Sequence, residues 1–436
     1  MLSKEDNELM CRVGPDTPMG QALRRYWVPA LQSSDLPAPD GDPRHVQLLG
    51  EHFVAFRDTN GDVGILDELC CHRGASLVLG RVEGCGIRCL YHGWKFAIDG
   101  TVMETPNVAD PSFKTRIKAR AYPVQEAGGL IWAYLGPEEL KPPFPHYPWF
   151  DLPAEYRLNA YLVENSNYVQ VAEALVDSSH LNILHADGLR SGDGSDLHFA
   201  QAAGLMQVDA APRLEVDDTE FGFHYAALRG GGDAGELEVR ITAWVAPFAV
   251  VNPNQDLWMA VVPINDEQSI YFHVFYDAER KIGIEPLRSE QLKFIGLDDE
   301  AIRNFGLTYD TLADREKPSR SNRFLQDRAA MRDGRFSGFH SFTQEDAAVI
   351  QSAGRIKDRT KETLSPADAA VMRLYRTLIG IARSVAAGGD PVGLGADPMQ
   401  IFGAFRKIPS DQDWRTIVPT HVVTKRQRAA RTASAA

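Results

Sequence analysis

Two short cysteine–histidine segments constrain this chain more than any other feature. Cys70 and His72 form a C-x-H pattern, and Cys89 and His92 form a C-x-x-H pattern. Two thiolates and two imidazoles can hold a tetrahedral zinc ion, or a [2Fe–2S] cluster in which two histidines replace two cysteines on one iron. Zinc sites usually pair cysteine with cysteine and histidine with histidine along the chain. Because each segment here contains one of each, the order favours the iron–sulfur cluster.

A second group of potential metal ligands follows a predicted helix that begins near Asn167. Asp177, His180 and His185 supply a carboxylate and two imidazoles, the ligand types of a non-haem Fe(II) site. Five residues of an ideal helix rotate through about 140°, so the two histidines would not share a helix face. The spacing therefore predicts a helix end or a local distortion between them. Taken alone, the pattern also fits a surface helix that carries two histidines and an acid.

Both segments resemble one protein family. Residues 70–74 and 89–94 read C-C-H-R-G and C-L-Y-H-G-W, which resembles the cluster-binding motif of the Rieske oxygenases. Cys71 departs from the proline that is usual at its position. Residues 167–185 resemble the catalytic-iron helix of these enzymes, especially the phthalate dioxygenase-like oxygenases that consist of α subunits only. The resemblance extends over nearly the whole chain.

The resemblance implies two metal centres. It also supplies the carboxylate ligand of the second centre, which spacing alone cannot find: the match falls on Asp346 within residues 344–349, with Glu345 as its less favoured neighbour. We therefore expect Cys70, His72, Cys89 and His92 to bind a Rieske [2Fe–2S] cluster, and His180, His185 and Asp346 to bind a mononuclear non-haem Fe(II).

Asp177 has a different role in the resemblance. It is implied to be an inter-subunit bridge for electron transfer, which hydrogen-bonds a ligand of the mononuclear iron and a cluster histidine of the neighbouring subunit. A carboxylate on a metal-bound imidazole is physically sensible, because it sets the ring tautomer and raises the basicity of the ligand. The same resemblance implies a homo-oligomer, either a trimer or stacked trimers.

The implied activity is that of the terminal oxygenase component of a multicomponent system. Such an enzyme uses O₂ and electrons from a reductase to hydroxylate, by cis-dihydroxylation in our prediction, an aromatic carboxylate. A monooxygenase or O-demethylase of an aromatic acid shares the same metal ligands and stays open. Two other classes also stay open: a Rieske electron-transfer protein without catalytic iron, and a zinc-stabilised binding protein.

A buried substrate carboxylate needs a cation or hydrogen-bond donors, because an unpaired buried anion is costly. Arg240, within a predicted strand, and Ser179, next to a predicted iron ligand, are our candidates for substrate binding. The chain has no glycine-rich dinucleotide loop, so another chain must take the electrons from NAD(P)H. We expect that partner to be a flavin/iron–sulfur reductase, acting directly or through a ferredoxin.

Charge and cysteine content exclude several other classes. A formal net charge of −13 argues against binding to nucleic acid or to an anionic membrane. No apolar run approaches the roughly 18 residues of a membrane span, and the first residues show no secretory signal. Cys11, Cys71 and Cys85 are left after the cluster ligands are assigned, and this odd remainder is typical of reduced thiols. We therefore expect a cytoplasmic protein.

The hydrophobic pattern predicts an α+β fold. A small antiparallel β Rieske [2Fe–2S] domain would be followed by a larger catalytic domain, in which helices flank an antiparallel sheet. The predicted strands include 46–49, 53–56, 63–66, 122–124 and 130–135 in the first domain, and 221–227, 239–244, 250–251, 258–262 and 271–276 in the second. A helix is expected up to Tyr26, and another over 365–386. The predicted divisions are 1–40 (an N-terminal segment packing on the catalytic domain), 41–140 (Rieske), 141–424 (catalytic) and 425–436 (a flexible tail).

Overall fold

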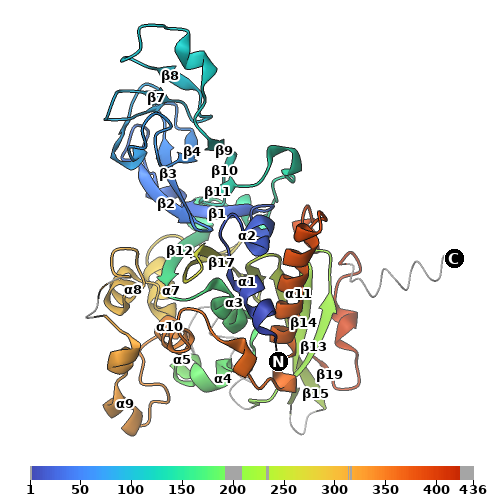
Figure 1. Ribbon diagram of the computed structural model, residues 1–436. Coiled ribbons are helices and arrows are strands. Elements are labelled where there is room, and N and C mark those ends of the chain that lie inside the picture. Colours follow the sequence, from blue (N-terminus) through green and yellow to red (C-terminus); the bar gives the residue numbers. More distant parts are fainter. Residues whose placement is uncertain (1, 192–208, 232–234, 313, 315–316, 423–436) are drawn as a thin grey trace, which may run out of the picture.

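The computed structural model describes residues 2–191, 209–231, 235–312, 314 and 317–422, so the predicted flexible tail 425–436 lies outside the described residues. Figure 1 shows a small β lobe above a larger body in which helices pack on a sheet. The predicted α+β fold, with a small antiparallel lobe and a larger antiparallel sheet flanked by helices, is confirmed. None of the described helices is both long and apolar enough to span a bilayer.

The small lobe consists of two four-stranded antiparallel sheets, with strand orders β2-β3-β4-β9 and β5-β6-β7-β8. A turn at Asp58–Gly61 joins β3 to β4, and the Asp58 side chain accepts hydrogen bonds from the N–H groups of Asn60 and Asp62. The lobe's strands are β2 (Arg44–Leu48), β3 (Glu51–Arg57), β4 (Val63–Asp67), β5 (Arg81–Val82), β6 (Ile87–Arg88), β7 (Lys95–Phe96), β8 (Val102–Glu104) and β9 (Ala121–Tyr122).

A three-stranded sheet, β1-β11-β10, lies between the lobe and the body. It contains β1 (Trp27–Gln32), β10 (Val124–Ala127) and β11 (Leu130–Tyr134). The prediction of a helix up to Tyr26 was wrong at its end, because α2 (Pro18–Leu23) stops earlier and β1 begins at Trp27. Pro29 is tolerated in β1 because this is an edge strand, paired only with β11, and the register shifts next to the proline.

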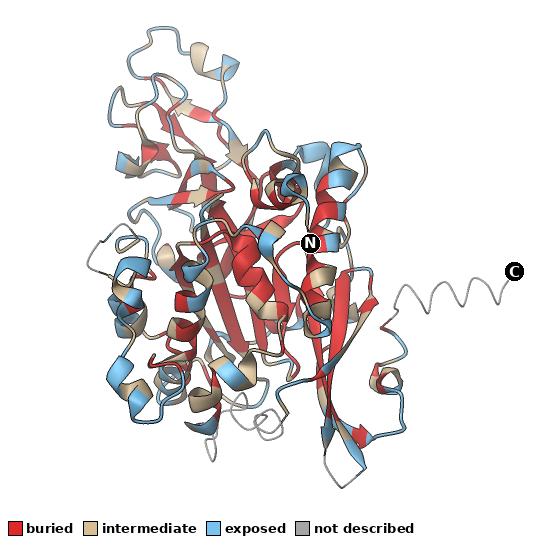
Figure 2. Cartoon of the chain, turned by 60° about the horizontal axis from the view of Figure 1, so that its bottom comes forward, coloured by how far each residue is buried: buried red, intermediate tan, exposed pale blue. Residues whose placement is uncertain are grey.

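The body is built on one antiparallel sheet with the order β12-β18-β17-β16-β15-β14-β13, to which β19 adds by pairing with β15. Its central strands are buried on both faces, as the red ribbons of Figure 2 show. The strands are β12 (Arg157–Glu164), β13 (Arg213–Asp218), β14 (Gly222–Gly231), β15 (Glu236–Val245), β16 (Ala249–Val251), β17 (Leu257–Asn265), β18 (Gln268–Tyr276) and β19 (Ala404–Pro409).

Helices cover the sheet and hold the N-terminal segment. The long helix α11 (Ala369–Ala386) contacts α1 (Lys4–Cys11), α2 and α3 (Tyr168–Val176), so residues near the N-terminus pack on the body. The helix predicted over 365–386 is present, but its first turn is a 3-10 helix at Pro366–Asp368, which Ser365 and Asp368 cap, and the α-helix itself runs from Ala369. The remaining α-helices of the described residues are α4 (Leu181–Leu184), α5 (Ala186–Ser191), α7 (Leu287–Ile295), α8 (Asp299–Phe305), α9 (Arg328–Arg332) and α10 (Phe342–Ser352).

Candidate metal centres and active-site cavity

The two predicted cluster loops have the same backbone design. In the first loop, the N–H of Gly74 donates to the carbonyl of Cys70 over 2.9 Å, and in the second the N–H of Gly93 donates to the carbonyl of Cys89 over 3.0 Å. Both glycines adopt positive φ angles, +70° and +77°, a conformation that glycine reaches without steric cost. Each loop therefore folds tightly around its cysteine, and the lobe presents two equivalent turns.

The four predicted cluster ligands come from these turns. The thiols of Cys70 and Cys89 are buried, and the rings of His72 and His92 lie 4.6 Å apart between centroids. The Nδ1 atom of His92 is buried without a hydrogen-bond partner among the described residues. Burial, and then the nearby Cys89, raises the pKa of Cys70 to about 11, so this thiol is protonated at neutral pH when no metal is bound. These features fit a group that takes two thiolates and two ring nitrogens.

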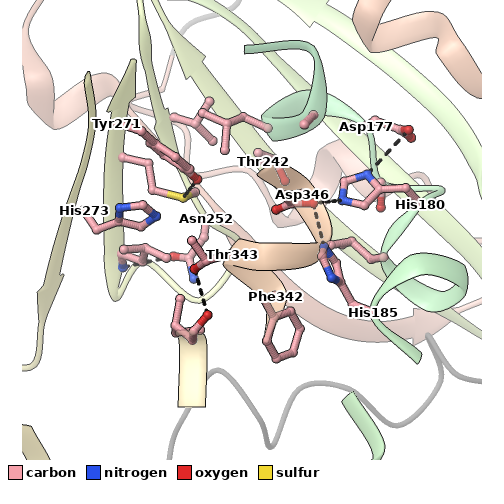
Figure 3. A pocket seen from close by; sticks show the side chains of 18 of the residues that line it. Asp177, His180, His185, Thr242, Asn252, Tyr271, His273, Phe342, Thr343 and Asp346 are labelled. Carbon is pink, nitrogen blue, oxygen red and sulfur yellow. Dashed lines mark hydrogen bonds and ion pairs between the residues drawn. The ribbon is translucent and has the colours of Figure 1, made fainter. Parts of the chain in front are cut away.

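The second predicted centre forms between two elements of the body. His180 and His185 flank the one-turn helix α4, which ends at Leu184, so a helix end lies between the two histidines as their spacing predicts. Asp346 comes from α10, and its Oδ1 lies 3.0 Å from Nε2 of His185 and 3.8 Å from Nε2 of His180. Figure 3 shows the three side chains converging. Their ligand atoms all lie within 4.8 Å of one another, as a metal site with three protein ligands requires.

The other ring nitrogens of these histidines face carboxylates. Nδ1 of His185 lies 2.7 Å from Oε2 of Glu345, and Nδ1 of His180 lies 3.5 Å from Oδ2 of Asp177. When each Nδ1 carries a proton, it can donate that proton to its carboxylate, and Nε2 is left with a free lone pair on the side of Asp346. This is the tautomer in which Nε2 can bind a metal. Sequence reasoning considered Glu345 only as a rival ligand and missed this role. Neighbouring helix residues point about 100° apart, so the two acids reach different atoms of one ring.

Charge around the second centre follows from this geometry. Burial by itself lowers the pKa of His185, but Asp346 and Glu345 outweigh burial and raise that pKa to about 9. Burial likewise raises the pKa of Asp346, yet His185 and His180 bring it below its usual value. Burial raises the pKa of Asp177 too, but the hydrogen bond and charge of His180, with the hydrogen bonds of Ser179, bring it to about 2. When no metal is bound, the proton on His185 therefore supplies the positive charge beside Asp346.

Ser179 is oriented toward Asp177. Its hydroxyl donates to Oδ1 of Asp177 over 2.6 Å, and its backbone N–H donates to the same atom over 2.8 Å. Ser179 is not among the residues that line the neighbouring cavity. In this conformation its hydroxyl holds the Asp177 carboxylate in place, with Oδ2 toward His180.

A cavity of about 140 Å³ opens beside the second centre. It is lined by His180, His185 and Asp346, and also by Arg240 of β15 and His273 of β18. Most of the remaining wall is apolar and includes Leu162, Leu175, Leu257, Met259, Ile295 and Phe342. The cavity therefore combines an apolar interior with a few polar groups, as small-molecule sites usually do.

Arg240 is the arginine among the residues that line this cavity. It is 8% exposed, and its guanidinium carbon lies 5.6 Å from the centre of the Phe405 ring. Burial, and then the positive charge of Arg229, lowers the pKa of Arg240 to about 10, so it stays protonated at neutral pH. His273 is also buried, which lowers its pKa to about 3 and keeps it neutral. Arg240 therefore gives the cavity a positive charge that does not depend on the second centre.

Comparison with known proteins covers both parts of the chain. Residues 26–123 match the Rieske [2Fe-2S] domain family, and residues 133–435 match the family described as LigXa C-terminal domain like. The chain is 36% identical to the phthalate 4,5-dioxygenase oxygenase subunit of Pseudomonas putida, over 95% of this chain and 94% of that protein. It is 34% identical to the 3-chlorobenzoate-3,4-dioxygenase oxygenase subunit of Comamonas testosteroni, over 95% of this chain and 98% of that protein.

Solved structures share the fold. Dicamba monooxygenase bound to dicamba matches with a TM-score of 0.56 at 18% identity, over 84% of this chain and 99% of that one. NdmA of Pseudomonas putida CBB5 with caffeine matches with a TM-score of 0.57 at 17% identity, over 91% of this chain and 100% of that one. At these identities the likeness concerns the fold alone.

The sequence relatives show the family as well as the fold, because their similarity extends over both the cluster lobe and the body. Oxygenase subunits of this kind work with an electron-transfer partner and with O₂, and they carry a mononuclear non-haem iron besides the cluster. The chain therefore belongs to the Rieske non-haem iron aromatic ring-hydroxylating oxygenases, as a phthalate dioxygenase-like α subunit whose cofactors are a Rieske [2Fe–2S] cluster and a mononuclear non-haem iron.

Proposed function

We propose that this chain hydroxylates an aromatic carboxylate, by cis-dihydroxylation, as the terminal oxygenase of a multicomponent system. The observation that carries this proposal is a single cavity lined by His180, His185 and Asp346 and also by the buried cation of Arg240. The partner would be an NAD(P)H-dependent flavin/iron–sulfur reductase, acting directly or through a ferredoxin. The printed names of two relatives, which refer to phthalate and 3-chlorobenzoate, support an aromatic acid as substrate.

We assign the ligands from the geometry. Cys70, His72, Cys89 and His92 would hold the cluster, and the Nε2 atoms of His180 and His185 with Oδ1 of Asp346 would hold the iron. When bound, the cluster supplies electrons one at a time, and an iron with two histidines and one carboxylate has open positions for O₂. Glu345 keeps the His185 ring in the tautomer that binds metal, since it accepts a hydrogen bond from Nδ1.

Arg240 would orient the substrate. A carboxylate inside this apolar cavity would be costly without a partner, and a guanidinium can donate two parallel hydrogen bonds to it. The apolar walls would then pack against the ring and exclude water from it. With the carboxylate held at Arg240, the ring would lie in the part of the cavity near His180 and Asp346.

Electron delivery would come from a neighbouring copy of the chain. In Figure 1, β7 and β8 of the lobe lie at one end of the molecule, and α4 and α10 lie at the other. The cluster turns of a chain are therefore remote from the iron ligands of the same chain. Asp177 retains 24% exposure of its side chain while it contacts His180. We propose that Asp177 bridges His180 to a cluster histidine of the next subunit, in a trimer or in stacked trimers.

Substitution of Arg240 tests the substrate class. With R240Q we expect KM for an aromatic acid to rise about ten- to hundredfold, the loss of a charged hydrogen bond, while KM for the corresponding amide changes little. R213Q is the matched control, because Arg213 is an exposed arginine on β13. If R240Q affected acid and amide equally, the proposed role of Arg240 would be wrong.

O-demethylation is the second candidate. The 5,5'-dehydrodivanillate O-demethylase oxygenase subunit of Sphingobium sp. (strain NBRC 103272 / SYK-6) is 29% identical over 91% of this chain. Turnover under ¹⁸O₂ separates the two activities. A cis-diol with two labelled oxygens supports dihydroxylation, whereas release of formaldehyde from a methoxylated acid supports demethylation.

A cytoplasmic location is part of the proposal. All five cysteines are free thiols in the structure, which fits a reducing compartment. Fractionation of the producing cells with a specific antibody tests this location.

A further inference from the structure

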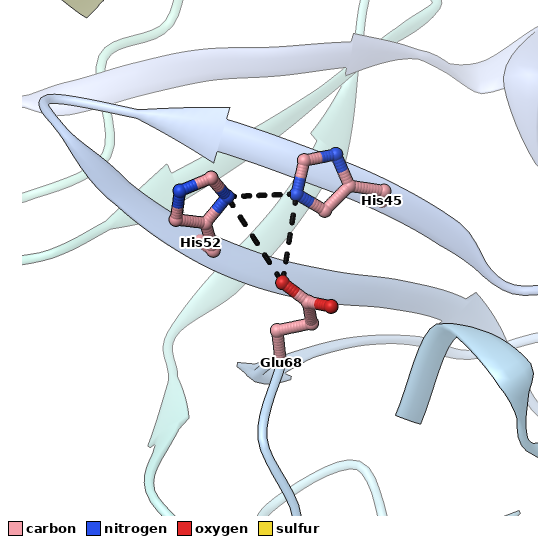
Figure 4. Close-up of side chains that lie close together, drawn as sticks. All are labelled: His45, His52 and Glu68. Carbon is pink, nitrogen blue, oxygen red and sulfur yellow. Dashed lines mark hydrogen bonds and ion pairs between the residues drawn. The ribbon is translucent and has the colours of Figure 1, made fainter. Parts of the chain in front are cut away.

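A third group of potential metal ligands lies on the small lobe, outside both cofactor sites. It consists of His45 on β2, His52 on β3 and Glu68, which follows β4 (Figure 4). In the β2–β3 register, His45 pairs with Val54 and Gln47 pairs with His52. His45 and His52 are therefore diagonal neighbours on one face of the sheet, within reach of each other's rings.

The three ligand atoms already form a small triangle. Nε2 of His45 lies 2.9 Å from Nδ1 of His52, and Oε2 of Glu68 lies 3.6 Å from the first and 4.0 Å from the second. Ligand atoms bound at about 2.0–2.2 Å to a tetrahedral zinc ion lie about 3.4 Å from one another. The observed distances bracket this value, so small movements of the side chains would close the site.

Glu68 is held in position for this role. Its Oε1 accepts a hydrogen bond of 2.6 Å from the hydroxyl of Ser76, which leaves Oε2 toward the two rings. Its backbone N–H donates to the carbonyl of His52 over 3.2 Å, which ties the end of β4 to β3. A hydrogen-bonded carboxylate of this kind is what supports a metal ligand from outside the coordination sphere.

We propose that His45, His52 and Glu68 form a binding site for a divalent first-row transition metal ion, with Zn²⁺ as the ion that suits it best. Two imidazoles and one carboxylate favour zinc, copper or nickel over magnesium or calcium, which take oxygen ligands. The side chains of His45 and His52 are 45% and 51% exposed, so the ion would keep a solvent-facing position for water. The ion would replace the proton that the two rings share.

This site would connect the β2–β3 hairpin to the first cluster loop. Glu68 lies just before Cys70 in the chain, and Ser76 lies just after the loop that contains Cys70 and His72. A metal ion bound to both histidines and to Glu68 would therefore restrain the lobe where that loop begins. We expect Zn²⁺ to raise the midpoint of thermal unfolding of the iron-loaded enzyme.

Zinc titration of the iron-loaded enzyme tests the proposal. The titration uses Zn²⁺ in competition with a chromophoric chelator and follows the Rieske absorption spectrum to verify that the cluster stays in place. We expect wild type to bind one more Zn²⁺ per chain than the H45A/H52A variant binds. We expect S76A to keep the site but to weaken it about tenfold, because it removes only the support of Glu68.

H146A is the matched control, because His146 is also exposed and also contacts a carboxylate, that of Asp151, at 2.8 Å. It should bind zinc as wild type does. Cu²⁺ provides a second measurement: its EPR spectrum should show coupling to two nitrogens in wild type and to only one nitrogen in H45A and in H52A. Equal zinc binding by wild type and H45A/H52A, with intact Rieske spectra in both, would overturn the proposal and identify the rings as a hydrogen-bonded pair only.

Discussion

His185 is the residue on which most of the catalytic centre depends. Its ring lies between two adjacent acids of α10, with Glu345 at Nδ1 and Asp346 at Nε2. The hydroxyl of Ser337 donates to the other oxygen of Glu345 over 2.5 Å, so this carboxylate is itself held in place. One acid therefore orients the ring, and the other is available to share a metal with it.

Replacing Glu345 separates these two functions. E345Q should lower Fe(II) affinity about 10- to 100-fold, the usual effect of losing a carboxylate that supports a metal-bound histidine, without removing a ligand. The measurement is anaerobic competition with a chelator, with the Rieske spectrum as a check on folding. E300Q, on an exposed acid of α8, should have no effect. Unchanged affinity in E345Q would contradict the role that we assign to Glu345.

Iron binding should also depend on pH through His185. The pKa of His185 is about 9 in the metal-free protein, where Asp346 and Glu345 outweigh the effect of burial. Iron must displace this proton, so the apparent affinity should fall about tenfold for each pH unit below 9 and level off above it. Anaerobic titrations with Fe(II) at several pH values between 6.5 and 8 measure the slope. A flat profile would mean that His185 is already deprotonated before iron binds.

At the scale of the elements, the two cluster turns form a matched pair for mutation. Gly74 and Gly93 occupy equivalent positions with positive φ, where any other residue costs about 1–2 kcal/mol. A Cβ on Gly74 would meet no heavy atom within 4 Å, whereas a Cβ on Gly93 would lie 2.8 Å from Cγ of Pro106. G93A should therefore lose more cluster than G74A. Iron and sulfide per chain, with the urea midpoint, measure the difference, and equal losses would contradict this reasoning.

Elements of this kind could be predicted because their signals are local. The Cys70–His72 and Cys89–His92 segments each lie within a few residues, and the helix expected from residue 365 follows from the pattern of one continuous stretch. The elements that were missed depend on distant partners. Strand β1 pairs with β11, β12 with β18 and β19 with β15, across separations that no short pattern records. The contact between Glu345 and His185 was missed for the same reason.

At the scale of the whole molecule, the arrangement of the lobe and the body raises the question of which cluster serves which iron. Figure 1 shows β7 and β8 remote from α4 and α10 within one chain. Sequence could not answer this question, because both sites belong to every subunit. If electrons cross between subunits in a cyclic oligomer, each active unit combines the cluster of one chain with the iron of the next.

Mixed oligomers distinguish the two routes. H180A should lack the iron but keep the cluster, and H92A should lack the cluster but keep the iron, so each alone should be inactive. When the two are co-expressed and associate at random, about a quarter of the subunit contacts pair a cluster donor with an iron acceptor. We therefore expect about a quarter of wild-type turnover per chain from transfer between subunits, and none from transfer within a chain. Oxygen uptake coupled to substrate measures the recovery.

Substitution of Asp177 shows which of the two chains in a mixed oligomer needs this residue. Because Asp177 contacts His180 of its own chain, it should matter only in the subunit that supplies the iron. D177N in the H92A chain should abolish the recovered turnover, whereas D177N in the H180A chain should leave it unchanged. The two H92A-type proteins should contain equal iron, which separates loss of the bridge from loss of the metal. Equal effects in both chains would mean that Asp177 supports folding or assembly rather than the passage of electrons between subunits.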